Sequence, residues 1–232
     1  MPEGKVVSQQ EWQAARKALL AKEKAFSRQR DEIARARRAL PWVKVEKDYA
    51  FDAPQGKVTL AGLFGPRSQL IVYHFMLGPG WDAGCKSCSY LADHFDGMLP
   101  HLAARDVSFA AVSRAPLAEI ETFRTRMGWR FPWVSSNGND FNFDFHVSFH
   151  KEDMGKQVEY NYALGEARME ELPGASAFYR DGSGAVFHTY STYARGLDTM
   201  IGAYNWLDIA PKGRDEDGLE FTMAWVRHHD RY

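Results

Sequence analysis

The sequence is poor in cysteine, in net charge and in long apolar runs. Two cysteines among 232 residues are too few for a scaffold held together by disulfides. Because 29 Lys and Arg nearly balance 30 Asp and Glu, no broad basic field is available for nucleic acid or an anionic membrane. The longest apolar run, at 70–77, is far below the roughly 20 residues that cross a membrane. The first residues, MPEGKVVSQQEWQAARK, lack the apolar block of a secretory signal, so we expect a cytoplasmic protein.

Several motifs for phosphate binding and hydrolysis are also missing. The sequence has no Gly-x-Gly-x-x-Gly or Walker loop and no Gly-x-Ser-x-Gly nucleophile elbow. The stretch 137–140, Asn-Gly-Asn-Asp, lacks the spacing and the terminal Glu of a calcium loop. We therefore predict no cofactor and no metal, and no nucleic-acid or membrane partner.

The first forty residues predict a long helix. Ser8 and Glu11 form a capping box, and no Pro or Gly follows until Pro41. A narrow apolar stripe repeats every seven residues, at Trp12, Leu19, Phe26, Ile33 and Leu40. Residues 1–40 contain ten basic and five acidic side chains, and interleaved acids favour a solvated face. We predict an N-terminal helical extension at 1–41, and a second hypothesis is a homodimer that pairs through its stripe.

Apolar residues make up 45% of the whole chain, which is enough for a buried core. The sequence after residue 41 predicts one enlarged domain of alternating strands and helices. Runs at 69–77 and 107–113 are typical of buried strands, and 131–135 of a short one. Helical spacing follows the cysteines, with a kink expected near Gly97 and Pro100, and a second helix opens at Pro116. The polar piece after Phe149 has a helical character, 175–193 reads as a β-hairpin, and 196–209 as a helix. The order predicts a mixed α/β sheet with helices on both faces.

Cys85-Lys86-Ser87-Cys88 is the most informative motif, because both cysteines lie where a buried strand gives way to a helix. A helix N-terminus offers unpaired amides and partial positive charge, which stabilise a thiolate and lower its pKa. Lys86 adds a cation beside it. We predict that Cys85 is the exposed nucleophile and that Cys88, one turn further on, is the resolving thiol of a dithiol–disulfide exchange centre.

Other interpretations of the pair remain open. Free cysteines are often small buried hydrophobes, so the pair is consistent with a redox-silent interaction protein. Two thiolates are also soft ligands that imidazoles would complete into a zinc or copper site. The candidate imidazoles are His74, His146, His150, His188, His228 and His229. For His228 and His229 in the charged tail, ion pairing or packing is the simpler interpretation.

Several long stretches carry a resemblance to a known family. They include LIVYHFMLGPGWDAGCKSCSYLADHFDG, FPWVSSNGNDFNFDFHVSF, FHTYSTYARG and PKGRDEDGLEFTMAWVRHHDRY. The chain resembles the thioredoxin-like superfamily and, more narrowly, the bacterial family catalogued as domain of unknown function 899, described as predicted dithiol–disulfide oxidoreductases. The resemblance implies a thioredoxin-like domain at 42–232, with an insertion at about 136–172 and a C-terminal extension at about 210–232. It also implies a protein disulfide or small thiol compound as substrate.

The resemblance implies supporting residues and also shows departures. The tryptophan usual beside the first cysteine is replaced by Gly84, with Trp81 the nearest substitute, and the dipeptide that tunes the redox poise is Lys86-Ser87. The family's cis-proline is expected near residue 174, where Pro173 lies one position off and 175–176, Ala-Ser, occupies the loop. The residues expected to support the thiolate or contact a partner are Trp81, Lys86, Ser87, Pro173 and Ser176. A Pro-x-x-x-Thr-x-x-Cys peroxidase loop is absent, because Gly78 and Asp82 stand at its Pro and Thr positions.

Overall fold

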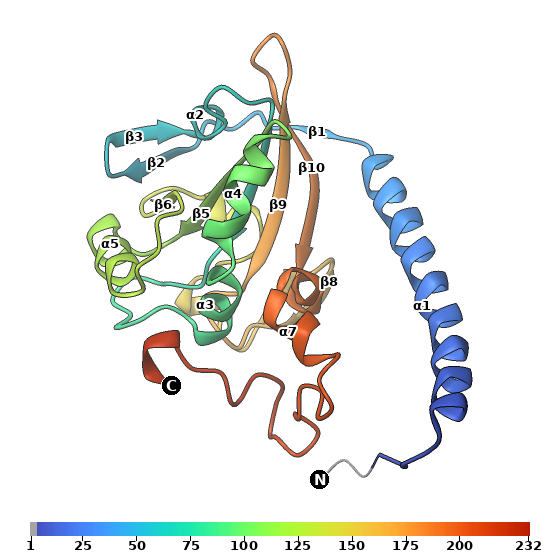
Figure 1. The fold of residues 1–232 in the computed structure, drawn as a ribbon. Helices are drawn as coiled ribbons and strands as arrows, with labels where there is room; N and C mark the ends of the chain where they lie inside the picture. Colours follow the sequence, from blue (N-terminus) through green and yellow to red (C-terminus); the bar gives the residue numbers. More distant parts are fainter. Residues whose placement is uncertain (1–3) are drawn as a thin grey trace.

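A mixed sheet forms the centre of the computed structural model, which describes residues 4–232 (Figure 1). Within these residues the sheet has eight strands in the order β1-β10-β9-β4-β5-β6-β2-β3. The strands are β1 (Val43–Lys44), β2 (Ala50–Ala53), β3 (Gly56–Thr59), β4 (Gln69–His74), β5 (Val107–Ser113), β6 (Trp133–Ser135), β9 (Gly174–Arg180) and β10 (Val186–Tyr193). A separate hairpin pairs β7 (Gln157–Tyr160) with β8 (Ala163–Glu166).

The strand directions identify the fold. β4, β5 and β6 run parallel, β9 pairs antiparallel with β4, and β10 pairs antiparallel with β9. The crossovers between the parallel strands contain α3 (Lys86–Ala92) and α4 (Phe95–Ala103), and then α5 (Leu117–Arg126). A parallel pair β4-β5 flanked by the antiparallel hairpin β9-β10 is the thioredoxin-like arrangement, so the predicted fold class is confirmed.

Helices cover both faces of the sheet. One buried cluster includes Leu91, Phe95 and Ile120 of α3, α4 and α5, and the other includes Leu60 of α2 (Leu60–Leu63) and Phe141 of α6 (Phe141–Asp144). Because successive strand residues point to opposite faces, β4 contributes Leu70 and Val72 to the second cluster and Tyr73 to the first. The run predicted as a strand at 69–77 stays buried to its end, although the strand itself stops at His74.

The helix after the cysteines is broken at a different place from the predicted kink. Gly97 and Pro100 both lie inside α4, and the break falls at Asp93 and His94, between α3 and α4. Asp93 Oδ1 accepts hydrogen bonds from Trp129 Nε1 at 2.8 Å and from His229 Nδ1 at 2.6 Å. Partners that are distant in the sequence hold this junction, and the local spacing of apolar residues could not show them.

The inserted segment contains a hairpin where the sequence suggested a helix. After α6 and the short 3₁₀ helix η1 (Lys151–Asp153), β7 and β8 are joined by Asn161 and Tyr162. Both of these residues have positive φ values, 53° and 62°. Two central residues with positive φ match the twist of the flanking strands, so a tight hairpin forms and the helical interpretation is wrong.

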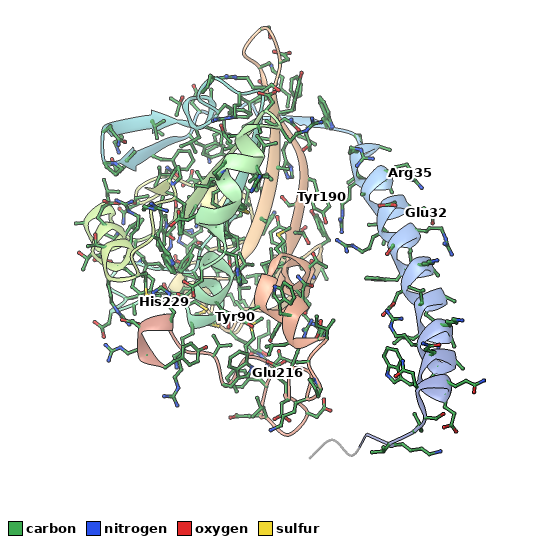
Figure 2. The ribbon with its side chains drawn as sticks, viewed as in Figure 1. Glu32, Arg35, Tyr90, Tyr190, Glu216 and His229 are labelled. Carbon is green, nitrogen blue, oxygen red and sulfur yellow. The ribbon has the colours of Figure 1, made fainter. Side chains whose placement is uncertain are left out.

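The C-terminal part continues from β10 as short helical turns and a long tail. The helix predicted at 196–209 is the 3₁₀ helix η2 (Ala194–Met200) followed by α7 (Gly202–Leu207). Residues 208–232 form mainly turns and end in η3 (His229–Arg231). Tyr90 of α3 packs edge-on against Tyr204 and Trp225, and Glu216 accepts hydrogen bonds from both of these side chains. Figure 2 labels Tyr90 and, below it in the tail, Glu216. The tail is therefore attached to the helical face of the domain.

The N-terminal helix α1 (Gln9–Arg38) stands beside the sheet and buries none of its residues (Figure 1). The predicted capping box is confirmed: Glu11 N donates to Ser8 Oγ, and Ser8 N donates to Glu11 Oε2. Near its end, the Arg37 guanidinium lies 5.4 Å from the ring centre of Tyr190 on β10. None of the helices in residues 4–232 combines the length and hydropathy that crossing a membrane requires. The division at residue 41 stays a prediction, and residues 1–3 of that extension lie outside the described residues.

Candidate functional site

Cys85 is held at the start of α3 by backbone hydrogen bonds on both sides. It is the N-cap residue, with φ −55° and ψ 133°, and the helix begins at Lys86. Cys85 N donates to Met76 O at 3.0 Å, and Cys85 O accepts from Ser89 N and Ser89 Oγ, both at 2.9 Å. The predicted position of the first cysteine at a helix start is therefore observed, and its backbone is fixed relative to the end of β4.

The packing around Gly84 explains why glycine, and not tryptophan, precedes Cys85. A Cβ atom at this position would lie 2.6 Å from Phe75 Cε1 and 2.7 Å from Phe123 Cε1, so two buried rings exclude any side chain. The Gly84 carbonyl also accepts a hydrogen bond from His228 Nε2 at 2.8 Å. The backbone just before Cys85 is thus packed against aromatic rings and attached to the C-terminal tail.

The two thiols differ in exposure and in acidity. Cys85 is half-buried and Cys88 is buried, and both are free thiols. The hydrogen bond from the Cys88 side chain lowers the pKa of Cys85 from its ordinary 9.0 to about 6, against the effect of burial, and contacts from Ser87 act in the same direction. Burial raises the pKa of Cys88 well above 9.0, and its contact with Cys85 adds to this. One sulfur therefore favours the thiolate and its neighbour favours the thiol.

Both cysteines line one small pocket. Its volume is about 210 Å³, and its lining includes Ser87, Tyr73 and Pro173 beside the two thiols. Tyr73 is 2% exposed, and it contacts Cys88 through a hydrogen bond that opposes the rise in the pKa of that thiol. A molecule that enters this pocket meets the Cys85 sulfur at one wall.

The structure brings only some of the predicted supporting residues to the cysteines. Pro173 directly precedes β9 and lines the pocket with Ser87. No peptide bond in the described part of the chain is cis, so Pro173 follows a trans bond. Lys86 is exposed, outside the pocket lining. Trp81 lines a separate hollow with Glu119 and other residues of the α5 region.

Ser176 lies on the opposite face of the sheet from the cysteines, inside β9 rather than in a loop before it. Ala175 is the register partner of Tyr73 and Ser176 that of Val72, so alternation turns Ser176 away from the pocket. Its hydroxyl lies 2.8 Å from His74 Nε2 and 2.8 Å from Ser191 Oγ. Ser176 thus belongs to a buried polar network that does not touch the cysteines.

Sequence reasoning missed residues that reach the site from far along the chain. Tyr73 was detectable in principle, because alternation along the β4 run places it with Phe75 on the face that α3, α4 and α5 cover. Met223 lines the pocket, and His228 holds Gly84, but no local pattern marks either residue. The packing and ion-pairing interpretation of the tail histidines agrees with the contacts of His228 and of His229, whose Nδ1 lies 2.6 Å from Asp93.

The histidines do not assemble a metal centre with the cysteines. Within residues 4–232, no group of three or more His, Cys, Asp and Glu side chains is arranged to hold a metal ion. His74 and His188 join the polar network through Ser176 and Ser191, and His150 stacks on Phe143. Among the described residues, the two sulfurs are therefore not joined by a third metal ligand.

Comparisons with known proteins find solved structures to which the chain is similar. The chain is similar to the solved peroxidoxin BcpB from Mycobacterium tuberculosis, at 14% identity over 70% of this chain and 94% of that one, with a TM-score of 0.46. It is also similar to peroxiredoxin Q from Xanthomonas campestris, at 21% identity over 66% and 87% of the two chains, with a TM-score of 0.43. The fold assignment rests on the strand order and strand directions.

No curated protein sequence matches the chain. Residues 1–232, in contrast, match the family described as "Bacterial protein of unknown function (DUF899)" from end to end. With the match spanning the whole sequence, the chain belongs to the DUF899 family.

Proposed function

We propose that the protein is a dithiol–disulfide oxidoreductase in which Cys85 attacks and Cys88 resolves. One observation carries the proposal: a half-buried thiol at the N-terminus of α3 shares a pocket with a buried thiol three residues further along the chain. The raised pKa of Cys88 and the lowering of the Cys85 pKa to about 6 agree with these roles. At pH 7 a group with that pKa is about nine-tenths ionised. The nucleophile is therefore present as thiolate before substrate arrives.

The exchange proceeds in two displacement steps. The Cys85 thiolate attacks one sulfur of a substrate disulfide, so a mixed disulfide forms and the other substrate sulfur leaves as a thiolate. Cys88 then gives its proton to the leaving group or to solvent and attacks the Cys85 sulfur, which releases the second substrate thiol. The pair of cysteines is oxidised by two electrons to a Cys85–Cys88 disulfide, and the substrate disulfide is reduced to two thiols.

Mild oxidation followed by alkylation tests this function. Reduced protein is treated with a small disulfide, the remaining thiols are alkylated under denaturing conditions, and the intact mass is measured. We expect the wild type to take up no alkyl group after oxidation, because both sulfurs are joined. The Cys88→Ser variant should instead retain half of the substrate as a mixed disulfide on Cys85. Two alkylated thiols in the oxidised wild type would overturn the proposal.

A further inference from the structure

The cysteine pocket is bordered by a roof that comes from segments outside the strands β4, β5, β9 and β10. We call two segments the roof: residues 194–201, which comprise η2 and the residue after it, and residues 222–223 of the tail. Both segments contribute side chains to the lining of the pocket. Leu197 and Ile201 are only 4% and 2% exposed, so this part of the roof is packed into the domain. The thiols therefore line a recess that the roof borders and that stays partly open to solvent.

Three hydrogen bonds to one carboxylate oxygen anchor the tail part of the roof. Glu216 Oε1 accepts from Tyr204 Oη at 2.8 Å, from Met223 N at 2.8 Å and from Trp225 Nε1 at 2.7 Å. Further along, Arg126 pairs with Asp230 at 2.9 Å, close to the contact of His228 with Gly84. Figure 1 shows the tail running from α7 past the lower end of α3. The backbone of Met223 is thus held in place at the wall of the cysteine pocket.

The size of the recess restricts what it admits. Its volume is about 210 Å³. Sites for drug-sized ligands usually occupy about 300–1,000 Å³. A bulky loop of a folded protein would meet the roof at the mouth of this recess, whereas a short organic chain is small enough to enter it.

The chemistry of the walls favours an uncharged apolar group. Met76, Leu91, Leu197, Ile201 and Met223 line the recess around the two sulfurs. Asp198 and Arg195 are the charged lining residues, and they pair with each other at 3.1 Å. Asp198 is also 3.7 Å from Arg214. The charges at the rim are therefore paired within the chain, and apolar side chains make up most of the lining around the sulfurs.

We infer that the substrate is a low-mass, uncharged organic disulfide with short apolar arms. This inference rests on the proposed function, since it names the substrate of the same cysteine pair. One arm enters the recess beside Met223 while the Cys85 thiolate attacks the adjacent sulfur. The first arm leaves as a thiolate and takes up a proton, the second leaves when Cys88 closes the internal disulfide, and two electrons pass from the dithiol to the substrate.

Single-turnover oxidation of the reduced full-length protein tests the inference. The probes are diethyl disulfide, the dication cystamine, the dianion 3,3′-dithiodipropionate and the protein insulin. Each rate is divided by the rate of the same disulfide with free N-acetylcysteine, which removes differences in intrinsic reactivity. We expect diethyl disulfide to exceed the charged probes by about tenfold or more, the factor expected from burying two carbon groups, and insulin to be slowest.

Substitutions in the roof provide the matched comparison. Met223→Trp fills the recess and should slow diethyl disulfide by about tenfold, whereas Met223→Leu keeps the volume and should preserve the rate. Met169→Trp, at a 46% exposed position, serves as the control for adding an indole. If Met223→Trp does not fold, Met223→Ala takes its place, and its enlarged recess should raise the relative rate of dibenzyl disulfide.

The outcomes separate the substrate class from the function itself. Equal normalised rates for all small disulfides, or insulin faster than diethyl disulfide, would overturn the inference while leaving thiol–disulfide exchange intact. Unchanged rates in every Met223 variant would overturn it as well. If no probe produces a Cys85–Cys88 disulfide at all, the proposed function fails, and the inference falls with it.

Discussion

At the scale of single residues, the pair is asymmetric because the two cysteines, three positions apart at the start of α3, have very different surroundings. Cys85 caps α3, where amide donors are unpaired, while Cys88 points into the core with 2% exposure. The Cys88 thiol donates to the Cys85 sulfur, so the two pKa values move apart. The two residues are of the same type, so their different surroundings are what distinguish the proposed nucleophile from the proposed resolving thiol.

The acidity of Cys85 predicts a pH profile. Alkylation by iodoacetamide should rise with pH and reach half of its maximum near pH 6, because only the thiolate reacts and its pKa is about 6. In the Cys88→Ala variant the main stabilising hydrogen bond is lost, so the midpoint should move upward. The rate is measured by mass spectrometry at each pH. A wild-type midpoint near the ordinary value of 9.0 would contradict the assignment.

The missing side chain at Gly84 predicts a stability effect. Gly84→Ala should lower the free energy of unfolding by about 1–3 kcal/mol, because overpacking forces the rings of Phe75 and Phe123 to shift. Gly97→Ala is the control, since a Cβ atom there meets nothing within 4 Å and lies inside α4. That control should be neutral or stabilising by about 0.5–1 kcal/mol. Urea denaturation measures both, and equal effects in the two variants would exclude the steric explanation.

At the scale of secondary structure, alternation along strands sorts side chains between two sites on opposite faces. The pocket face receives Tyr73, and the other face receives His74 with its neighbour Ser176. A chain of short contacts continues from Ser176 to Ser191 at 2.8 Å and from Ser191 to His188 at 2.7 Å. Polar side chains therefore connect the strands β4, β9 and β10 on the face opposite the cysteines.

The buried His74 predicts acid sensitivity. Burial lowers the pKa of His74 from 6.5 to about 3, with His188 acting in the same direction. Between these values the unfolded chain binds a proton that the folded chain does not, so stability falls as the pH falls through 6.5. From pH 6.5 to 5 this amounts to about 2 kcal/mol.

The matched variant is His74→Gln, which retains a polar partner for Ser176. It should lose about 2 kcal/mol less than the wild type over the same pH interval. His101→Gln, at an exposed position of α4, should behave as the wild type does. Urea titrations at pH 6.5 and 5.0 decide the matter, and identical losses in wild type and His74→Gln would refute the role of this histidine.

At the scale of the whole molecule, the domain is extended at both ends with opposite consequences. The C-terminal tail returns to the domain, where Met223 borders the cysteine pocket and His228 contacts Gly84. The N-terminal helix does the reverse, because its large apolar residues remain exposed while only its last turn approaches β10. Exposed fractions along the stripe run from 44% at Ile33 to 60% at Phe26.

The exposed stripe on α1 leads to a prediction about assembly. If two copies pair through residues 12–40, the protein should have about double its 26.4 kDa mass in solution. Phe26→Glu should return it to a single copy, because a charge would be buried in the pairing face. Arg28→Glu, off the stripe on the same helix, is the control. The measurement is the sedimentation of the wild type and of both variants. If all three proteins have the same mass, pairing through the stripe is excluded.

The sequence by itself determined the elements whose signals are local. The capping box of Ser8 and Glu11, the buried runs of β4 and β5 and the β9–β10 hairpin all follow from neighbouring residues, and so does the position of Cys85 at a helix start. From these the fold class could be expected, since crossovers and hairpins have few allowed arrangements. The same signals predict a thiol next to helical amides.

Only the tertiary structure decided what surrounds the sulfurs. The face on which Ser176 lies follows from the register of β9 against β4, and the separation of Trp81 from the pocket follows from the loop before α3. The roof depends on contacts such as His228 with Gly84, which are 144 positions apart. Helix and strand signals arise from hydrogen bonds and periodicity within a few residues, whereas these contacts arise when distant segments exclude water together, and no short stretch of sequence encodes that.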